Sequence, residues 1–309
     1  MLQGKDLLSI HDLSTDEVAE ILDCAARLKT LQKSGVEHKL LAGKTLGMIF
    51  EKSSTRTRVS FEVGIFQLGG TGLFLSSKDL QLGRGEPIKD TARVLARYLD
   101  GIMIRTFEQA KVEELAKYAD IPVINGLTDL LHPCQVLTDL LTIREHKGKN
   151  FRALKMAYVG DGNNMTNSYL YGAAKVGMTL TVATPAGYRP NQKVFDNALA
   201  DAEETGAKLS WTENPADAVR DADIIATDTW ASMGQEAEHD ARKKIFAPYQ
   251  VNKNLLRGAS KNAIVLHCLP AYRGEEITDD VLEDNAHVIF DEAENRLHTQ
   301  KAIMALTMV

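Results

Sequence analysis

Short apolar runs alternate with amphipathic stretches along the chain, and this alternation is typical of α/β domains with parallel sheets. The first amphipathic stretch opens at Ser14-Thr-Asp-Glu17, which has the spacing of a helix capping box. It predicts a helix to about Leu31 with one apolar face, made by Val18, Ile21, Leu22, Ala25 and Leu28.

The first half of the chain predicts one array of alternating strands and helices. Its expected strands are Thr45 to Phe50, Gly72 to Leu75, Gly101 to Arg105 and Pro122 to Asn125. Its expected later helices are Arg56 to Leu68, Asp90 to Leu99, Val112 to Tyr118, and Pro133 to about His146. This array ends near Gly148-Lys-Asn150, which we take as a domain boundary.

The second half predicts another such array. Its expected strands are Lys155 to Val159, Thr179 to Ala183, Asp223 to Thr227 and Ala263 to His267. Its expected helices are Asn163 to Val176, Gln192 to Glu204, Gln235 to Ile245 and Glu292 to Met308. The predicted fold class is therefore α/β, with two doubly wound parallel-sheet domains and a cleft between them, because such sheets bind ligands beyond the carboxyl ends of their strands.

Composition supports two globular domains, since the 309 residues are 44% hydrophobic and 25% charged. No apolar run approaches the roughly 18 to 20 residues that span a bilayer, and the N-terminus lacks the apolar core of a signal peptide. We therefore expect a cytoplasmic protein. The net charge of -6 argues against nucleic-acid or membrane partners, so an anionic substrate would need a local basic cluster.

The three cysteines, Cys24, Cys134 and Cys268, lie far apart and show no metal-ligand spacing. We expect neither a disulfide framework nor a metal site. Cys24 falls on the apolar face of the first helix and is interpreted as structural.

The strongest local signal is Ser53-Ser-Thr-Arg-Thr-Arg58, which follows an apolar strand and opens a helix. Free backbone N–H groups, hydroxyls and guanidinium groups converge there, as in an anion site. The alternative is a capped helix with solvated arginines. The segment lacks the glycines and lysine of a P-loop, and no GxGxxG follows any strand, so a nucleotide is poorly supported.

Two further signals fall at strand ends or in the loops after them. Arg105 closes an apolar strand, where a charged side chain points into the crevice at the sheet's edge. His132-Pro-Cys-Gln135 places His132 and Gln135 together near a helix start, because Pro133 suits the first helical turn. A lone histidine is also compatible with a purely structural role.

The chain resembles the aspartate/ornithine carbamoyltransferase family, whose carbamoyl-phosphate signature combines S-T-R-T-R, a strand-end arginine and H-P-x-Q in this order. Asp228-Thr-Trp-Ala-Ser-Met-Gly234 and His267-Cys-Leu-Pro270 match the D-x-x-x-S-M-G and H-C-L-P motifs of its ornithine branch. Gly160-Asp-Gly-Asn-Asn164 and Glu294-Asn-Arg296 also fit. The resemblance covers nearly the whole chain in collinear order.

The resemblance implies two sets of binding residues. Carbamoyl phosphate would be bound by Ser54, Thr55, Arg56, Thr57, Arg105, His132, Gln135, Cys268, Leu269 and Arg296, with Gln81 reaching across a subunit boundary. Ornithine would be bound by Asn164, Asp228, Ser232 and Met233. The residues expected to act in catalysis are Arg105, His132 and Cys268.

The resemblance also implies the domain roles and the reaction. Residues 1–148, joined by a C-terminal helix over 292–309, would bind carbamoyl phosphate, and residues 151–291 would bind ornithine. The expected reaction carbamoylates the side-chain amine of L-ornithine and gives L-citrulline and phosphate, with no cofactor, in a homotrimer. Arg105, Thr57 and His132 are donors suited to the negative charge that develops on the carbamoyl oxygen.

Plainer interpretations of two residues stay open. Asp228 suits the α-ammonium of an amino acid, but an aspartate in this position can also cap a helix or lie in a solvated loop. Cys268 follows an apolar strand and could be a small buried hydrophobe; in the family its sulfur lies near the substrate's amine, which suggests steering rather than nucleophilic attack.

Three other functions compete with this hypothesis. A carbamoyltransferase for aspartate, putrescine or an acylated ornithine is disfavoured by the two ornithine-branch motifs. A nucleotide-dependent oxidoreductase is suggested by Val159-Gly-Asp-Gly-Asn but lacks GxGxxG spacing. A non-catalytic binding protein is disfavoured by the intact set of site residues. The sequence leaves open whether the enzyme serves arginine synthesis or breakdown.

Overall fold

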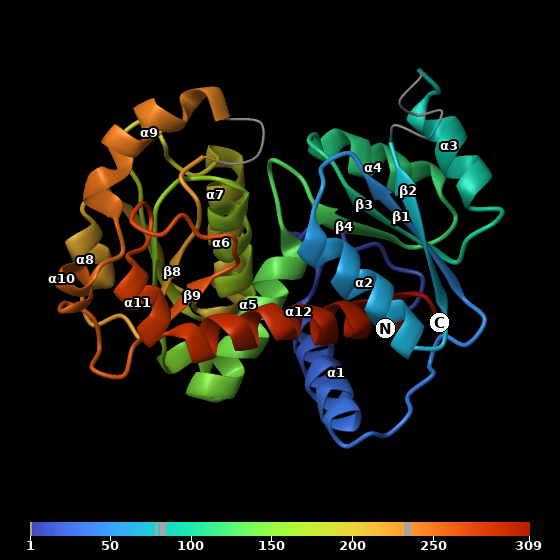
Figure 1. Ribbon diagram of the computed structural model, residues 1–309, viewed down its shortest axis with the longest axis horizontal. Helices are drawn as coiled ribbons and strands as arrows, with labels where there is room; N and C mark the ends of the chain where they lie inside the picture. Colours follow the sequence, from blue (N-terminus) through green and yellow to red (C-terminus); the bar gives the residue numbers. More distant parts are fainter. Residues whose placement is uncertain (1, 78–79, 81–84, 232–235) are drawn as a thin grey trace. The chain divides into compact units, whose positions relative to one another are not determined.

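The computed structural model in Figure 1 describes residues 2–77, 80, 85–231 and 236–309. The chain forms two compact units: unit 1 comprises Met1–Leu141 and Glu294–Val309, and unit 2 comprises Thr142–Ala293. Two helices contain residues of both units, α5 (Pro133–Lys147) and α12 (Ala286–Thr307). Among the described helices, none combines the length and the apolar character needed to cross a membrane.

Unit 1 contains a four-stranded parallel sheet in the order β2-β1-β3-β4. Its strands are β1 (Thr45–Phe50), β2 (Thr71–Ser76), β3 (Gly101–Arg105) and β4 (Val123–Leu127). The chain passes from β1 outward to β2 and then returns to the other side of β1 to form β3. The strand order therefore reverses between β1 and β3, and this switch point is where open α/β sheets bind ligands.

Helices cover both faces of this sheet. They are α1 (Thr15–Lys33), α2 (Thr55–Gln67), α3 (Ile88–Leu95) and α4 (Gln109–Tyr118), together with the parts of α5 and α12 in unit 1. Ile102 and Ile104 point to the face that packs on α3 and α4. Because successive side chains alternate along a strand, Arg105 points to the opposite face. Gly101 also faces that side, where any Cβ would lie 3.0 Å from the sulfur of Met308.

Unit 2 contains a five-stranded parallel sheet in the order β7-β6-β5-β8-β9. Its strands are β5 (Lys155–Val159), β6 (Thr179–Ala183), β7 (Leu209–Thr212), β8 (Ile224–Thr227) and β9 (Ile264–His267). The order reverses between β5 and β8, so a second switch point lies beyond Val159 and Thr227.

The helices of unit 2 also pack on both faces of its sheet. They are α6 (Asn164–Val176), α7 (Gln192–Thr205), α8 (Pro215–Val219), α9 (His239–Phe246), α10 (Lys253–Leu256) and α11 (Asp279–Asp284). Helices α6 and α7 lie side by side (Figure 1). The opposite core joins Val159, Ile225 and Val265 to Val219 of α8 and Leu282 of α11. Short 3-10 turns occupy Ile10–Asp12, Phe151–Ala153, Glu236–Glu238 and Ala247–Tyr249.

The predicted fold class is confirmed in its two doubly wound parallel sheets, but several elements differ from the prediction. Helix α12 begins at Ala286 rather than at Glu292, and α9 begins at His239 rather than at Gln235, which lies outside the described residues. Strand β7 and helices α8, α10 and α11 were not predicted. Strand β7 is a short edge strand of half-exposed, partly polar residues, so it lacks the continuous apolar run of a central strand.

Candidate active site

The loop from β1 to α2 forms an anion cradle at the switch point of unit 1. Ser54 is the N-cap of α2: its Oγ accepts a hydrogen bond from the Thr57 backbone N–H at 3.2 Å. The Ser54 hydroxyl also donates to Thr57 Oγ1 at 3.1 Å. Other N–H groups in the first turn of α2 have no acceptor within the helix, so the helix start favours an anion.

Arg296 of α12 joins two elements of this cradle. Its Nη2 donates to Thr57 Oγ1 at 2.7 Å, and its Nη1 donates to Gln135 Oε1 on α5. The Gln135 Nε2 donates in turn to Asp139 Oδ1 at 2.8 Å. All four side chains are buried. The starts of α2 and α5 are therefore held together by one guanidinium group from the C-terminal helix.

The two arginines of the Ser-Thr-Arg-Thr-Arg segment differ in their surroundings. Arg58 is exposed, lies over the ring of Phe74 at 3.9 Å and pairs with Glu62 at 3.3 Å. Arg56 is half-buried, and its guanidinium makes no hydrogen bond or ion pair with other described residues. The charge of Arg58 is thus already paired within the described part of the chain.

Arg105 and His132 lie buried in the same unit, at the ends of β3 and of the loop that precedes α5. The Arg105 carbonyl accepts from the backbone N–H groups of Glu51 and Lys52, so the cradle loop is attached to the end of β3. Burial lowers the pKa of His132 well below its usual 6.5, and the charges of Arg296 and Arg105 lower it further. His132 is therefore a neutral hydrogen-bond donor at neutral pH.

Two charged residues next to the cradle were not predicted from the sequence. Lys52 is buried, pairs with Asp129 and lies 4.4 Å from the ring centroid of Phe107. Glu51 accepts hydrogen bonds from Thr106 and Lys111. These contacts fix the cradle loop to the segments after β3 and β4. The only sequence signal was their position between a strand and the Ser53–Arg58 segment.

In unit 2, Asp228 lies at the switch point and has three described donors. Asn163 Nδ2 donates to its Oδ2 at 3.1 Å, and the Thr229 N–H and Cys268 Sγ donate to its Oδ1 at 2.8 and 3.3 Å. Asn163 is also the N-cap of α6, where its Oδ1 accepts from the Met165 N–H at 2.9 Å. This role of Asn163 was not predicted, although an asparagine before a helix is a recognisable cap signal.

The adjoining loop carries a buried ion pair. Asp161 Oδ2 accepts from Arg242 Nη1 at 2.8 Å, and the same nitrogen donates to the Trp230 carbonyl at 2.8 Å. Burial raises the pKa of the Asp161 carboxyl to about 6, while Arg242 opposes this shift. The pair attaches α9 to the loop before Asn164, which is the first residue of α6.

The predicted site residues that are described fall into two groups, one in each unit. In unit 1 the hydrogen bonds join Ser54, Thr57, Gln135 and Arg296, and in unit 2 they join Asp228 to Cys268. Gln81, Ser232 and Met233 lie outside the described residues. None of the three cysteines forms a disulfide with another; Cys24 and Cys134 are buried, and burial raises the pKa of the Cys134 thiol to about 12. Cys268 is partly exposed.

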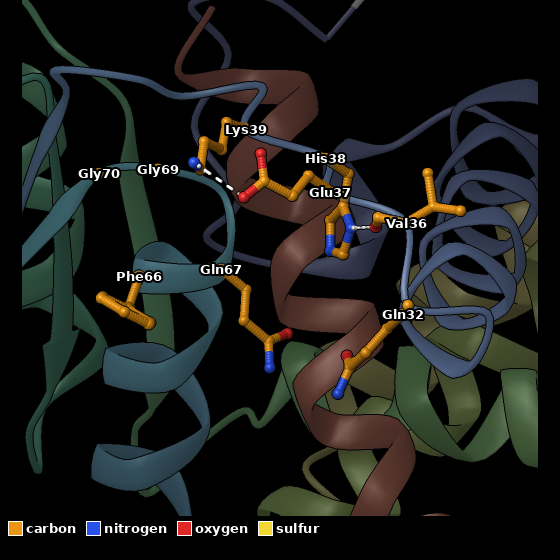
Figure 2. A pocket seen from close by; sticks show the side chains of 10 residues that line it. Gln32, Val36, Glu37, His38, Lys39, Phe66, Gln67, Gly69 and Gly70 are labelled. Carbon is orange, nitrogen blue, oxygen red and sulfur yellow. Dashed lines mark hydrogen bonds and ion pairs between the residues drawn. The ribbon is translucent and has the colours of Figure 1, made fainter.

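A separate hollow of about 680 Å³ in unit 1 contains none of the predicted site residues (Figure 2). It is lined by the segment Gly35–Lys39 and by Gln32, Phe66, Gln67, Gly69 and Gly70. Gln32, His38 and Gln67 each accept a hydrogen bond from the fully buried Lys301 ammonium, at 2.8, 3.0 and 2.9 Å. All three ammonium protons are thus used within the chain, and we do not assign this hollow to the active site.

Comparison with known proteins finds two family models that match the chain one after the other. The family model "Aspartate/ornithine carbamoyltransferase, carbamoyl-P binding domain" matches residues 5–145, and the model for the Asp/Orn binding domain matches residues 152–307. Together these models cover most of the chain. The chain therefore belongs to the aspartate/ornithine carbamoyltransferase family.

Within that family, the chain is similar to proteins named ornithine carbamoyltransferase. The protein of that name from Carboxydothermus hydrogenoformans is 58% identical, over 99% of this chain and 98% of its own. The solved structure from Pyrococcus furiosus has a TM-score of 0.96 at 54% identity and covers 99% and 98% of the two chains. The anabolic enzyme from Campylobacter jejuni has a TM-score of 0.91 at 44% identity, with 97% of each chain covered.

Proposed function

We propose that this chain transfers the carbamoyl group of carbamoyl phosphate to the side-chain amine of L-ornithine, and releases L-citrulline and phosphate. Similarity to ornithine carbamoyltransferases over the whole chain supports this function. The structural observation that carries it is the presence of an anion cradle in unit 1 and, at the switch point of unit 2, of a carboxylate, Asp228, with no cation among its described partners. The first suits a phosphate and the second suits an amino acid's ammonium group.

Carbamoyl phosphate binds in unit 1 in this proposal. Its phosphate lies at the start of α2, where Ser54, Thr55, Arg56 and Thr57 supply N–H, hydroxyl and guanidinium donors. Arg105, His132 and Gln135 bind the carbamoyl end, and Arg296, which already contacts Thr57 and Gln135, lies between the two. Gln81, Cys268 and Leu269 complete the proposed set.

The reaction needs charge stabilisation more than covalent chemistry. The neutral amine of ornithine attacks the carbamoyl carbon, and negative charge develops on the carbamoyl oxygen. Thr57, Arg105 and the neutral His132 donate hydrogen bonds to that oxygen. The C–O bond to phosphate then breaks, Arg56 stabilises the leaving group, and phosphate accepts the amine proton. Fixing both substrates in place supplies the entropic part of the rate enhancement.

Ornithine binds in unit 2 in this proposal, with its α-ammonium on Asp228. Asn164 binds the α-carboxylate, and Ser232 and Met233 supply the remaining contacts. Cys268, which already contacts Asp228, lies beside the reacting amine and orients it. Among the described residues, the donors to Asp228 are an amide, a backbone N–H and a thiol, and none is a cation. A second substrate carboxylate, as in aspartate, would have no charge partner among them.

An acceptor panel tests this function. The purified protein is given carbamoyl phosphate with L-ornithine, L-aspartate, putrescine or N-acetyl-L-ornithine, and each ureido product is quantified. We expect ornithine to be preferred by about 100-fold or more in kcat/KM, because a buried polar group left without its partner penalises the wrong substrate. Equal rates with aspartate or putrescine would refute the assignment of Asp228 to the α-ammonium.

We also propose that the chain forms a homotrimer through α2 and β2. Val59, Val63 and Phe66 follow one another at helical spacing on α2, and all three are exposed, Phe66 by 76%. Phe74 of β2 is a further exposed apolar side chain. Exposed apolar side chains that share one face of a helix favour a protein interface. The segment that contains Gln81 follows β2 directly, which supports a shared site in which a neighbouring copy supplies this residue.

Native mass spectrometry tests the trimer. The wild-type protein is expected at three chain masses, and Phe66→Glu is expected to give monomers, because it places a charge in the apolar surface. Phe290→Glu replaces an exposed phenylalanine on α12 and is expected to leave the trimer intact. A wild-type monomer with full activity would exclude both the trimer and a shared Gln81.

The direction of metabolism is proposed from the relatives alone. The proteins from Pyrococcus furiosus and Campylobacter jejuni are named anabolic, which favours citrulline formation for arginine biosynthesis. A KM for ornithine well below that for citrulline in the reverse reaction would support this direction, and the opposite order would contradict it.

A further inference from the structure

A buried pair of side chains lies behind the turn that carries Cys268. His267 is the last residue of β9, and its imidazole is fully buried against Glu276, whose side chain is also fully buried. The His267 Nε2 and the Glu276 Oε1 are 3.0 Å apart. Neither residue belongs to the proposed substrate contacts, so the cost of burying them calls for another explanation.

The hydrogen bonds around His267 fix its tautomer. The Leu269 backbone N–H donates to His267 Nδ1 at 2.9 Å, and a backbone N–H can only donate. The Nδ1 atom is therefore an acceptor, and the imidazole proton lies on Nε2, where it is donated to Glu276 Oε1. Glu276 Oε1 also accepts the Tyr272 N–H at 2.6 Å, which fixes the carboxylate itself.

The turn that this tautomer stabilises is strained. Leu269 has a φ of 57°, in the left-handed region that residues other than glycine rarely adopt. Its N–H is held by the side chain of His267, and the His267 N–H is held by Glu292 Oε2 at 2.9 Å. Between these two fixed N–H groups lies Cys268, whose Sγ reaches Asp228 Oδ1 at 3.3 Å.

We infer that Glu276 is a positioning residue for carbamoyl transfer: acting through the Nε2–H tautomer of His267, it holds the Cys268–Leu269 turn in place beside Asp228. The inference deepens the proposed function and rests on it, because in that proposal Asp228 binds the α-ammonium of ornithine and Cys268 lies beside the reacting amine. Without an acceptor at Oε1, the imidazole proton is free to move to Nδ1. The Leu269 N–H then loses its acceptor, and the strained turn relaxes.

The structure also indicates which replacement should preserve this role. Glu276 Oε1 accepts both described hydrogen bonds, whereas Oε2 is buried and has no hydrogen-bond partner among the described residues. Glutamine keeps an oxygen at the first position, so Glu276→Gln should retain the His267 tautomer. Leucine fills similar space but offers no acceptor, so Glu276→Leu should lose it. A merely space-filling role would leave both variants similarly active, because both side chains fill similar space.

Steady-state kinetics of folded, trimer-checked variants test the inference. For Glu276→Leu we expect kcat/KM for ornithine to fall about 10- to 100-fold, because small misplacements of reacting groups are costly. Its KM for carbamoyl phosphate should rise less than its KM for ornithine, since most of the proposed contacts with carbamoyl phosphate lie in unit 1 and do not depend on the Cys268–Leu269 turn. Glu276→Gln should retain most activity. Glu283→Leu, which removes an exposed carboxylate paired with Arg273, is the matched control.

A second measurement keeps the inference falsifiable if Glu276→Leu fails to fold. The ¹⁵N shifts of the His267 imidazole in the wild-type protein report directly which nitrogen carries the proton. A proton on Nδ1, or a folded Glu276→Leu with wild-type ornithine kinetics, would overturn the inference. If the wild-type protein makes no citrulline while the Nε2–H tautomer is observed, the proposed function fails and the hydrogen-bond arrangement stands.

Discussion

Arg296 and Thr57 are joined by a hydrogen bond of 2.7 Å, although 239 positions separate them in the chain. The same guanidinium donates to Gln135 on α5. The anion cradle of unit 1 is therefore completed only after the last helix has packed onto elements formed much earlier in the sequence. The planar guanidinium group of Arg296 has several donors in fixed positions, and this makes the double contact possible. The single ammonium group of a lysine could not make the same two contacts.

Removal of the Arg56 charge at the start of α2 should impair phosphate binding. Arg56→Ala is expected to lose about 1.5 to 3 kcal/mol of transition-state stabilisation, because it removes a charge-assisted hydrogen bond to the phosphate. Steady-state kinetics should show at least about a tenfold lower kcat/KM for carbamoyl phosphate. The control is Arg27→Ala, an exposed arginine on α1. Wild-type kinetics in a folded Arg56→Ala protein would show that the cradle does not bind the phosphate.

Loss of the Asp228 carboxylate at the switch point of unit 2 should weaken the binding of ornithine. Asp228→Asn is expected to raise the KM for ornithine by about 10- to 100-fold, because a charged hydrogen bond to the α-ammonium is lost. The KM for carbamoyl phosphate should change little. Asp217→Asn, which alters an exposed partner of Arg220, serves as the control. Equal effects on both substrates would argue for a general structural role of Asp228.

Activity should rise with pH because the attacking amine must be neutral. A side-chain ammonium of this kind resembles lysine, with a pKa near about 10.4, so its neutral fraction grows about tenfold per pH unit below that value. Burial and the charges of Arg296 and Arg105 hold the pKa of His132 well below 6.5, so His132 stays neutral as the pH rises from about 6 to about 9. We expect kcat/KM for ornithine to rise throughout this range.

His132→Asn separates the two groups in the same pH series. Asparagine keeps a donor but does not titrate, so the rate should fall at every pH while the slope of the profile is unchanged. A slope that flattens in this variant would mean that His132, rather than the amine of ornithine, produces the pH dependence.

The buried ammonium of Lys301, which contacts three residues that line the separate hollow, should make the stability of the protein depend on pH in the alkaline range. Burial lowers the pKa of Lys301 from its ordinary 10.5 to about 8. Between these values the unfolded chain binds more protons than the folded one, so the free energy of unfolding should increase as the pH rises through this window. Chemical denaturation of wild type and Lys301→Met should show a difference that grows in favour of wild type from about pH 8 to about pH 10. A pH-independent difference would contradict the shifted pKa.

Three of the strands nearest the switch points were predictable because most of their residues are buried. Thr45–Phe50, Gly101–Arg105 and Lys155–Val159 have the predicted bounds, since their apolar runs carry the signal directly. The first turns of α12 were missed, because Val288, Ile289 and Phe290 have strand-like local preferences. Tertiary packing, including Ile289 in the core of unit 2, determines the helix there.

The site was predictable where its residues are adjacent in the chain. Ser53–Arg58 and His132–Gln135 each place several polar groups at one helix start, so local spacing was sufficient. The contact of Asn163 with Asp228 depends on β5 and β8 being neighbours, although β6 and β7 lie between them in sequence. The pairing of His267 with Glu276 likewise depends on how the turn after β9 folds back. The first relationship follows from the strand order and the second from the path of the turn, and no local sequence pattern encodes either.

The most direct test of the proposed reaction follows the carbamoyl carbon itself. Carbamoyl phosphate labelled with ¹³C is mixed with L-ornithine and the purified protein, and the reaction is monitored by NMR while phosphate is measured in parallel. We predict that the label moves to the ureido carbon of citrulline, with one phosphate released for each citrulline formed and no such transfer when ornithine is omitted. Phosphate release at the same rate without ornithine, or the absence of labelled citrulline, would contradict carbamoyl transfer to ornithine.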